Sequence, residues 1–240
     1  MKKNIIPKVN IKEFIYQYRY ALLQLYWLIY LPWFAFLEKK VTTHFHVIHM
    51  ELDDFVPFVP VFCIPYFLWF GYVAVTFIYT LFHDQSEYLR ACLFLFTGMT
   101  IFLIISTVYP NGHYMRYDVV LGDGIFDQLI RRLWETDTST NLFPSIHVFN
   151  SIGAHIALSR CENLRDNKWI KYGSFTLMCS IILSTIFIKQ HSVFDVMTAL
   201  LMALALYPIA YSKAPENAIQ KLRDALQTRR LRKKYRDITW

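Results

Sequence analysis

A histidine and an aspartate stand four positions apart where a polar turn enters a long apolar run. They are His191 and Asp195, in the stretch STIFIKQHSVFD at 184–195. Residues i and i+4 share one face of a helix, so Asp195 can accept a hydrogen bond from the His191 ring. Ionisable residues at the edge of a membrane span are costly and usually have a functional reason. The pair therefore predicts a functional histidine whose ring is oriented by a carboxylate.

A second histidine, His147, has a similar place in the sequence PSIH at 144–147. Like His191, it stands where an apolar segment begins. Two histidines and a carboxylate at the starts of two apolar segments suggest phosphoryl or acyl transfer.

The elements that must position these residues are predicted to be membrane helices. The chain has 240 residues, of which 55% are hydrophobic and 18% aromatic. Several apolar runs approach the roughly 20 residues that span a bilayer. We therefore predict an all-α, polytopic membrane protein. The six predicted spans are 20–37, 55–82, 89–109, 144–159, 170–188 and 192–211.

Two of these spans are unusual. The second is too long for a simple crossing, and Pro57, Pro60 and Pro65 predict that its start is kinked or interfacial. The fourth is short and rich in polar residues, so we expect the bundle to shield it from lipid. The 110–143 loop mixes Phe126, Leu133 and Trp134 with Arg131 and Arg132, which favours a short amphipathic helix in the interface.

The distribution of charge predicts the orientation. Most of the 25 lysines and arginines lie in 1–19, 160–171 and 212–240. Cytoplasmic loops carry the excess of such residues, so both termini are expected to be cytoplasmic and the histidine sites to face the other side. The net charge of +7 is concentrated at the two ends of the chain, which indicates lipid headgroup contact and not nucleic-acid binding. We expect one membrane domain at 1–212 and a basic cytoplasmic tail at 213–240, including RRLRKKYR at 229–236. A cleavable leader is not expected, and a bacterial cell membrane is the expected location.

Three stretches, in order, resemble the signature of the type 2 phosphatidic acid phosphatase superfamily. YPNGHYMRY at 109–117 is similar to the first motif and keeps its arginine as Arg116. PSIH at 144–147 is similar to the second motif, Pro-Ser-Gly-His. Ser184, then His191 and Asp195 at the expected spacing, resemble the third. The likeness covers about 90–212, which it implies is the catalytic core.

The sequence departs from the superfamily pattern where phosphate is bound. Tyr109 stands in place of a lysine, Tyr117 of a proline, Ile146 of a glycine and Thr185 of an arginine. We expect Lys189 to supply the missing positive charge. The bulky residue after the motif-two serine resembles the branch that includes inositol phosphorylceramide synthases.

The chemistry of the residues agrees with this resemblance. His191 would be the nucleophile, because Asp195 fixes its tautomer and leaves a lone pair for substrate. His147 would protonate the leaving alkoxide and later deprotonate water. Arg116 and Lys189 would supply charge to the phosphate oxygens. Ser145 and Ser184 would add hydrogen bonds, the former at a helix N-terminus. No metal or cofactor is required.

Structural roles are open for several of these residues. Arg116 could be an interfacial arginine, Ser145 could simply cap a helix and Ser184 could simply pack. The leading expectation is hydrolysis of a lipid phosphate or diphosphate. A phosphotransferase, in which an alcohol replaces water, uses the same residues. A lipid-binding or transport protein with a degenerate site is a third alternative.

Overall fold

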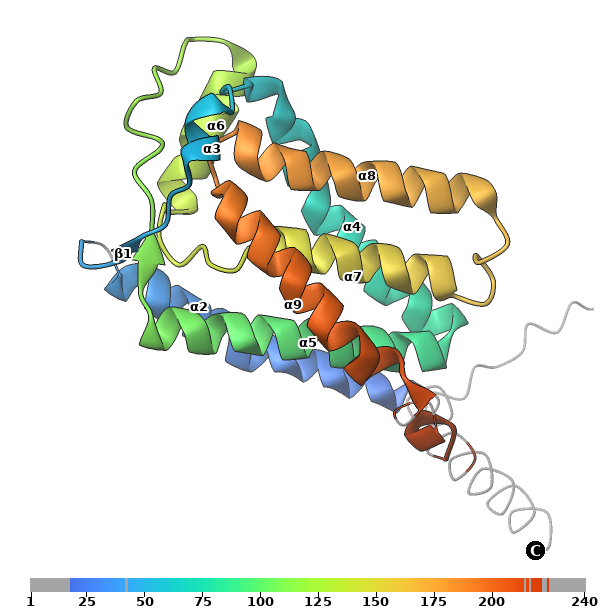
Figure 1. Ribbon diagram of the computed structural model, residues 1–240. Coiled ribbons are helices and arrows are strands. Elements are labelled where there is room, and N and C mark those ends of the chain that lie inside the picture. The colour runs from blue at the N-terminus through green and yellow to red at the C-terminus, as the bar shows by residue number, and fades with distance from the viewer. Residues whose placement is uncertain (1–17, 42, 214, 216, 222–223, 225–240) are drawn as a thin grey trace, which may run out of the picture.

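Helices make up most of the computed structural model, which describes residues 18–41, 43–213, 215, 217–221 and 224 (Figure 1). The basic run at 229–236 lies outside the described residues. The helices, in chain order, are η1 (Arg19–Tyr26), α2 (Trp27–Lys40), α3 (Glu51–Phe55), η2 (Pro60–Phe62), α4 (Cys63–His83), α5 (Gln85–Val108), α6 (Ile125–Thr136), α7 (Ile146–Arg160), α8 (Lys168–Phe187) and α9 (Val193–Tyr211).

Four of the long helices, α5, α7, α8 and α9, begin at short polar side chains that accept from free backbone N–H groups. Asp84 accepts from Glu87 N at the start of α5, and Asn167 accepts from two amides at the start of α8. Ser145 and Ser192 do the same for α7 and α9. Such caps pair N–H groups that the first helical turn leaves without partners. They define where these four apolar runs become helical.

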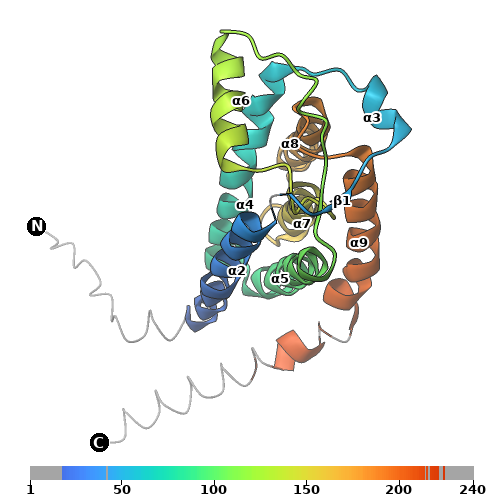
Figure 2. The same cartoon turned by 90° about the vertical axis from the view of Figure 1, so that its left-hand side faces the viewer.

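Helix α7 lies at the centre of the bundle. It packs against α4, α5, α8 and α9, and the end-on view places these four helices around it (Figure 2). Its first turns are buried at Val148, Phe149 and Asn150. The neighbouring helices therefore shield the polar residues of this segment, as the sequence predicted.

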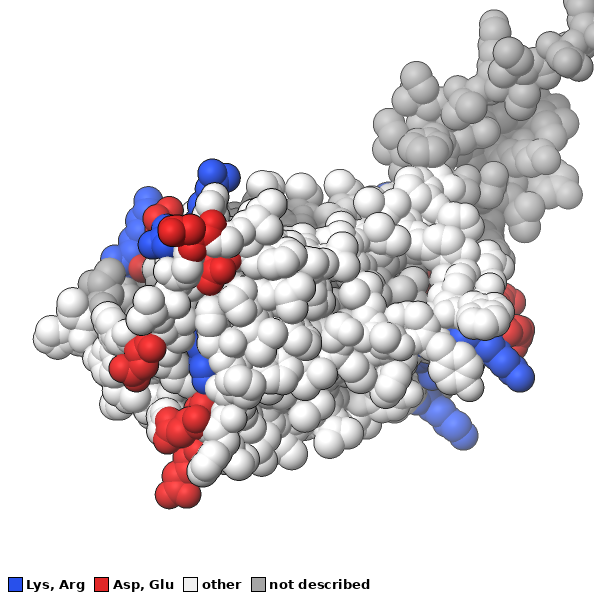
Figure 3. All heavy atoms as spheres, turned by 90° about the horizontal axis from the view of Figure 1, so that it is seen from above, with Lys and Arg blue, Asp and Glu red and all other residues white. Residues whose placement is uncertain are grey.

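In the part of the chain that the structure describes, five helical segments are long and apolar enough to cross a membrane: Arg19–Lys40, Pro60–His83, Gln85–Val108, Lys168–Phe187 and Val193–Tyr211. Helix α7 has 15 residues, which gives about 22 Å of length against about 30 Å of hydrocarbon core. The six predicted apolar segments are thus all helical, but the length criterion for a span is met by five. On the face that Figure 3 shows, Lys, Arg, Asp and Glu gather toward the two ends of the bundle and leave an uncharged band between them.

The unusual start of the second apolar run is confirmed. Helix α3 ends at Phe55, and a non-helical stretch leads to the short turn η2 before α4 begins at Cys63. The amphipathic helix in the 110–143 loop is also confirmed, as α6. Its Ile130 and Leu133 are buried against the start of α4, where they contact a cluster that includes Tyr66.

Three loops are tied together at one end of the bundle. Two short parallel strands, β1 (His46–Val47) and β2 (Asn111–Gly112), join the segment after α2 to the segment after α5. Gly112 also bridges to Thr140. A Cβ at Gly112 would lie 2.6 Å from the Ser139 carbonyl oxygen, so this approach of two backbones needs glycine. The same end, on the left of Figure 1, holds α3, α6 and the starts of α7 and α9.

Candidate functional site

The predicted contact between His191 and Asp195 is present. His191 Nδ1 lies 3.3 Å from Asp195 Oδ2, and the two residues are 5% and 0% exposed. His191 precedes the first turn of α9, so the contact runs through the helix cap and not along one helical face. The same Asp195 oxygen accepts from Ser192 N at 2.9 Å, while Ser192 Oγ accepts from Phe194 N. This reciprocal cap fixes the carboxylate that faces the ring.

His147 lies on the other side of the His191 ring. His191 Nε2 and His147 Nδ1 are 3.4 Å apart. Since Nδ1 of His191 donates to a carboxylate, its Nε2 is the bare nitrogen and His147 supplies the hydrogen of this contact. The His147 ring packs between Tyr66 and Trp69 of α4, with ring centroids 4.5 and 4.4 Å away. A chain of carboxylate, imidazole and imidazole results.

The N-terminus of α7 is joined directly to α9. Ser145 is fully buried, and its N–H donates to the Asp195 carbonyl oxygen at 3.3 Å. Its hydroxyl caps α7 by accepting from Val148 N at 3.4 Å. This bond between the two helix starts explains why histidines that are 44 positions apart meet. Ser145 therefore has the capping role that the sequence suggested. Its bond to the Asp195 carbonyl group also keeps it next to the histidine site.

Arg116 is held by backbone carbonyl groups. Its guanidinium donates to the carbonyl oxygens of Lys189 at 3.2 Å, Asp137 at 2.8 Å and Thr138 at 3.2 Å, and it lies 5.4 Å from the centre of the Trp134 ring. Three of the five N–H donors of arginine are used in this way. The remaining two have no partner among the described residues, so Arg116 is fixed in place with donors to spare for an anion.

The Lys189 ammonium points toward α3. It donates to the carbonyl oxygens of Val56 at 2.6 Å and Asp53 at 3.0 Å, and the side chain is 9% exposed. The residue has φ 54°, in the left-handed region. One of the three N–H groups of the ammonium remains. Lys189 is therefore two residues from His191, but most of its hydrogen-bonding capacity is directed away from the ring.

Ser184 lies inside α8 and does not join the cluster. The residue is fully buried, and its hydroxyl donates to the Ile181 carbonyl oxygen at 2.6 Å within the same helix. None of its described contacts reaches His147 or His191. Of the seven predicted site residues, the structure thus brings six to the site and leaves the Ser184 hydroxyl bonded within α8.

A second polar network, which the sequence did not predict, lies behind the two histidines. Tyr66 Oη donates to Asp137 Oδ2 at 2.5 Å, and Gln190 Nε2 donates to the same oxygen at 2.8 Å. Buried His113 donates from Nε2 to the Gln190 carbonyl oxygen at 3.1 Å. Burial and, to a smaller extent, the Arg116 charge lower the pKa of His113 to about 3. These groups orient the turn that carries His191.

The loop that carries Asp137 is itself anchored to α2 and β2. Glu38 accepts from Thr138 Oγ1 at 2.6 Å and from Asn141 Nδ2 at 3.1 Å. Asn111 Oδ1 accepts from Leu142 N and Phe143 N at 2.8 and 2.9 Å. In the sequence, Glu38 and Asn111 stand out only as polar residues at the ends of apolar runs. That position does not show which residues they bind.

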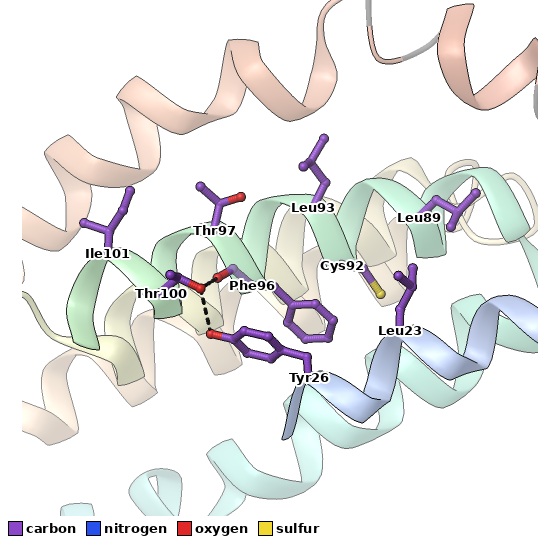
Figure 4. Close-up of a pocket in the computed structure, with 9 residues that line it drawn as sticks. All are labelled: Leu23, Tyr26, Leu89, Cys92, Leu93, Phe96, Thr97, Thr100 and Ile101. Atoms are coloured by element: carbon purple, nitrogen blue, oxygen red, sulfur yellow. Dashed lines mark hydrogen bonds between the residues drawn. The ribbon is translucent and has the colours of Figure 1, made fainter. Parts of the chain in front are cut away.

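Two cavities border the described part of the bundle. One of about 490 Å³ lies beside the site and is lined by Lys189, Asp53, Asp54, His49, Tyr114 and Asp118, with four apolar neighbours. The other, of about 530 Å³, is an apolar groove between the first helical segment and α5, where Tyr26 contacts Thr100 (Figure 4). The groove follows residues 89–101 of α5, away from the α5 end that meets the site loops.

The site can support nucleophilic chemistry at an anionic centre. It combines an oriented imidazole, a second imidazole and a fixed guanidinium, all in a largely buried setting. Among the described residues, no group of three His, Cys, Asp or Glu side chains is arranged to hold a metal ion. No family model, curated protein or solved structure matches this chain.

Proposed function

We propose that this chain is an integral membrane enzyme that hydrolyses a lipid phosphate or diphosphate through a phosphohistidine, without a metal ion. The resemblance of three ordered motifs to the type 2 phosphatidic acid phosphatases supports this function. The observation that carries it is the chain Asp195–His191–His147, with contacts of 3.3 and 3.4 Å, beside the fixed guanidinium of Arg116.

In the first step, His191 Nε2 attacks phosphorus and the bond to the lipid alkoxide breaks. The alkoxide takes the Nδ1 proton of His147, which enters the step as an imidazolium and leaves it neutral, so the lipid leaves as an alcohol, or as a monophosphate if the substrate is a diphosphate. Asp195 stabilises the positive charge that develops on the His191 ring. In the second step, water gives a proton to His147 and attacks phosphorus, the N–P bond breaks, and phosphate leaves.

Substrate must separate the two imidazoles. A phosphorus atom cannot fit between nitrogens that are 3.4 Å apart, so the direct contact belongs to the enzyme without substrate. His147 is the ring that would turn, because Tyr66 and Trp69 hold it by ring packing alone, whereas His191 is also hydrogen-bonded to Asp195. The N–H that His147 directs at His191 would then meet the leaving oxygen.

Phosphate release from a panel of lipid monophosphates and diphosphates tests the proposal. Purified protein is assayed in mixed micelles with a chelator present. We expect release that falls at least about 10²-fold in His191→Ala and in His147→Ala. His83→Ala is the matched control, since His83 is exposed at the far end of α4 and should keep full activity. Binding of lipid phosphates without any release, unaffected by His191→Ala, would instead support a non-catalytic lipid-binding protein.

A phosphotransferase is a second candidate, and the cavity beside Lys189 favours it. The carboxylates of Asp54 and Asp118 and the hydroxyl of Tyr114 line this cavity, and carboxylates would accept hydrogen bonds from the hydroxyl groups of an alcohol. Such an alcohol would replace water in the second step and take the phosphoryl group from His191. A new phosphate monoester of an alcohol added to the same assay, in place of free phosphate, would identify the transferase.

A further inference from the structure

Asp53 lies nearly 140 positions before His191 in the sequence. Both its side-chain carboxylate and its backbone carbonyl group nevertheless contact the turn that carries His191. The side chain is 3% exposed. Its Oδ1 accepts from Val193 N at 2.7 Å, and its Oδ2 accepts from Ser192 Oγ at 2.6 Å. Its carbonyl oxygen accepts from Lys189 Nζ at 3.0 Å. Asp53 therefore binds the chain on both sides of His191.

Asp53 is also fixed on its own segment. Its Oδ2 accepts from Met50 N at 2.8 Å, which closes the first turn of α3. The two oxygens thus accept three hydrogen bonds, and all three donors are N–H or O–H groups that a carboxylate prefers. The carboxylate lies at the N-terminus of α9, where a negative charge is stabilised by the helix dipole. A neutral side chain of the same size would lose part of each interaction.

The contact reaches His191 through Ser192. Because the Ser192 hydroxyl donates to Asp53, its lone pairs face Phe194 N, and the hydroxyl is fixed in the capping geometry. The Ser192 N–H in turn donates to Asp195 Oδ2, the oxygen that faces His191 Nδ1. Each link in this path is 3.3 Å or shorter.

We infer that Asp53 is a positioning residue for the nucleophile, in that it holds Ser192 and Val193 so that Asp195 keeps His191 in the tautomer with a bare Nε2. The inference rests on the proposed function for its effect on turnover. Its effect on the His191 ring does not depend on that function. The two can therefore be tested separately.

The tautomer is read by nitrogen NMR of protein labelled with ¹⁵N-histidine, with His191→Ala used to assign the resonance. We expect wild type to show His191 protonated at Nδ1, and Asp53→Asn to show a mixture of tautomers or an averaged signal. Glu51→Gln is the matched control, because Glu51 is an exposed acid of the same helix and its loss should leave the spectrum unchanged. An unchanged His191 spectrum in folded Asp53→Asn would overturn the inference, whatever the protein does to lipids.

Kinetics provide the second readout. In Asp53→Asn we expect kcat to fall by about 10²-fold, as for a small misplacement of a reacting group, with KM little changed because Asp53 is not proposed to touch phosphate. If Asp53→Asn does not fold, Ser192→Ala breaks the same path while leaving the Asp53 bond to Val193, and it should give a smaller kcat loss in the same direction. Wild-type kcat in the folded variant contradicts the positioning role. Absence of turnover in wild type contradicts the proposed function and leaves the NMR test standing.

Discussion

At the scale of single residues, one carboxylate oxygen connects helix formation to the orientation of the candidate nucleophile. Asp195 Oδ2 closes the cap of α9 through Ser192 N and also faces His191 Nδ1. This arrangement could be predicted from sequence because it is local, and a serine followed three residues later by an acid is a capping pattern. The contacts of Asp53 and Asp137 could not, since they join segments far apart in the chain and follow no spacing rule.

Lys189 offers a test of phosphate binding at this scale. Lys189→Ala should raise the concentration of inorganic phosphate needed for half-inhibition of turnover by about 10-fold or more, because one charge-assisted hydrogen bond is lost. Lys189→Gly should do the same, and it also removes the cost of the left-handed backbone at φ 54°. Equal phosphate inhibition in wild type and both variants would mean that the ammonium serves only the carbonyl oxygens of Asp53 and Val56.

His113 makes the stability of the fold depend on pH. Its pKa is about 3 in the folded protein and about 6.5 in an unfolded chain. Between these values the unfolded state binds the extra proton, so the stability that is present above about pH 6.5 is lost as the pH falls toward about 3.

Melting temperatures from about pH 7 to about pH 4 check this effect. His113→Gln keeps an N–H donor for the Gln190 carbonyl oxygen but cannot become charged, so its melting temperature should fall less steeply. His83→Gln, at an exposed histidine, should follow the wild-type curve. Parallel curves for wild type and His113→Gln would contradict the account of this buried ring.

At the scale of elements, the central helix depends on close contact with α5. A Cβ built on Gly98 would lie 2.1 Å from Cε1 of Phe149, and one on Gly153 would lie 2.4 Å from Leu95 Cδ2. The Phe149 ring is fully buried and stacks on Phe94 at 4.7 Å, so it has little room to move. Small residues at helix contacts are typical of membrane bundles.

Gly98→Ala should therefore destabilise the bundle by about 1–3 kcal/mol through overpacking. Gly173→Ala is the matched control, since nothing lies within 4 Å of a Cβ at Gly173 in α8. That change should be neutral or add up to about 1 kcal/mol through helix propensity. Thermal unfolding in one detergent compares the two. A similar change in melting temperature for both variants would contradict the close approach of α5 and α7.

The long helices could be predicted well from hydropathy and proline positions. The start of α4 after Pro60 and the helix α6 in the long loop both follow from local patterns. The length of α7 could not be interpreted from the sequence alone, because a short apolar segment is compatible with a span or with a helix enclosed by others. Its place at the centre of α4, α5, α8 and α9 depends on packing that no single segment encodes.

At the scale of the whole molecule, the candidate site lies at one charged end of a long apolar bundle. The bias of lysine and arginine along the chain predicts that this end faces away from the cytoplasm. Val120 is 94% exposed in the loop at the site end, and Asp166 is exposed in the loop at the opposite end. These positions suit a test of orientation.

A membrane-impermeant thiol reagent should label Val120→Cys in intact cells. Asp166→Cys should react only after the cells are permeabilised. The wild-type chain sets the background, because Cys63, Cys92 and Cys161 are buried and Cys179 is partly buried. The opposite labelling pattern would reverse the predicted orientation and would move the site to the cytoplasmic side.

The most direct test of the account is to find the phosphoryl group on the protein. The protein is incubated with a lipid phosphate that carries radioactive phosphorus, quenched in denaturant at alkaline pH, and its labelled peptide is identified by mass spectrometry. We predict an acid-labile, base-stable label on His191 that is absent in His191→Ala and accumulates in His147→Ala when the substrate has a good leaving group. Full turnover by His191→Ala, or a label on any other residue, would contradict the account.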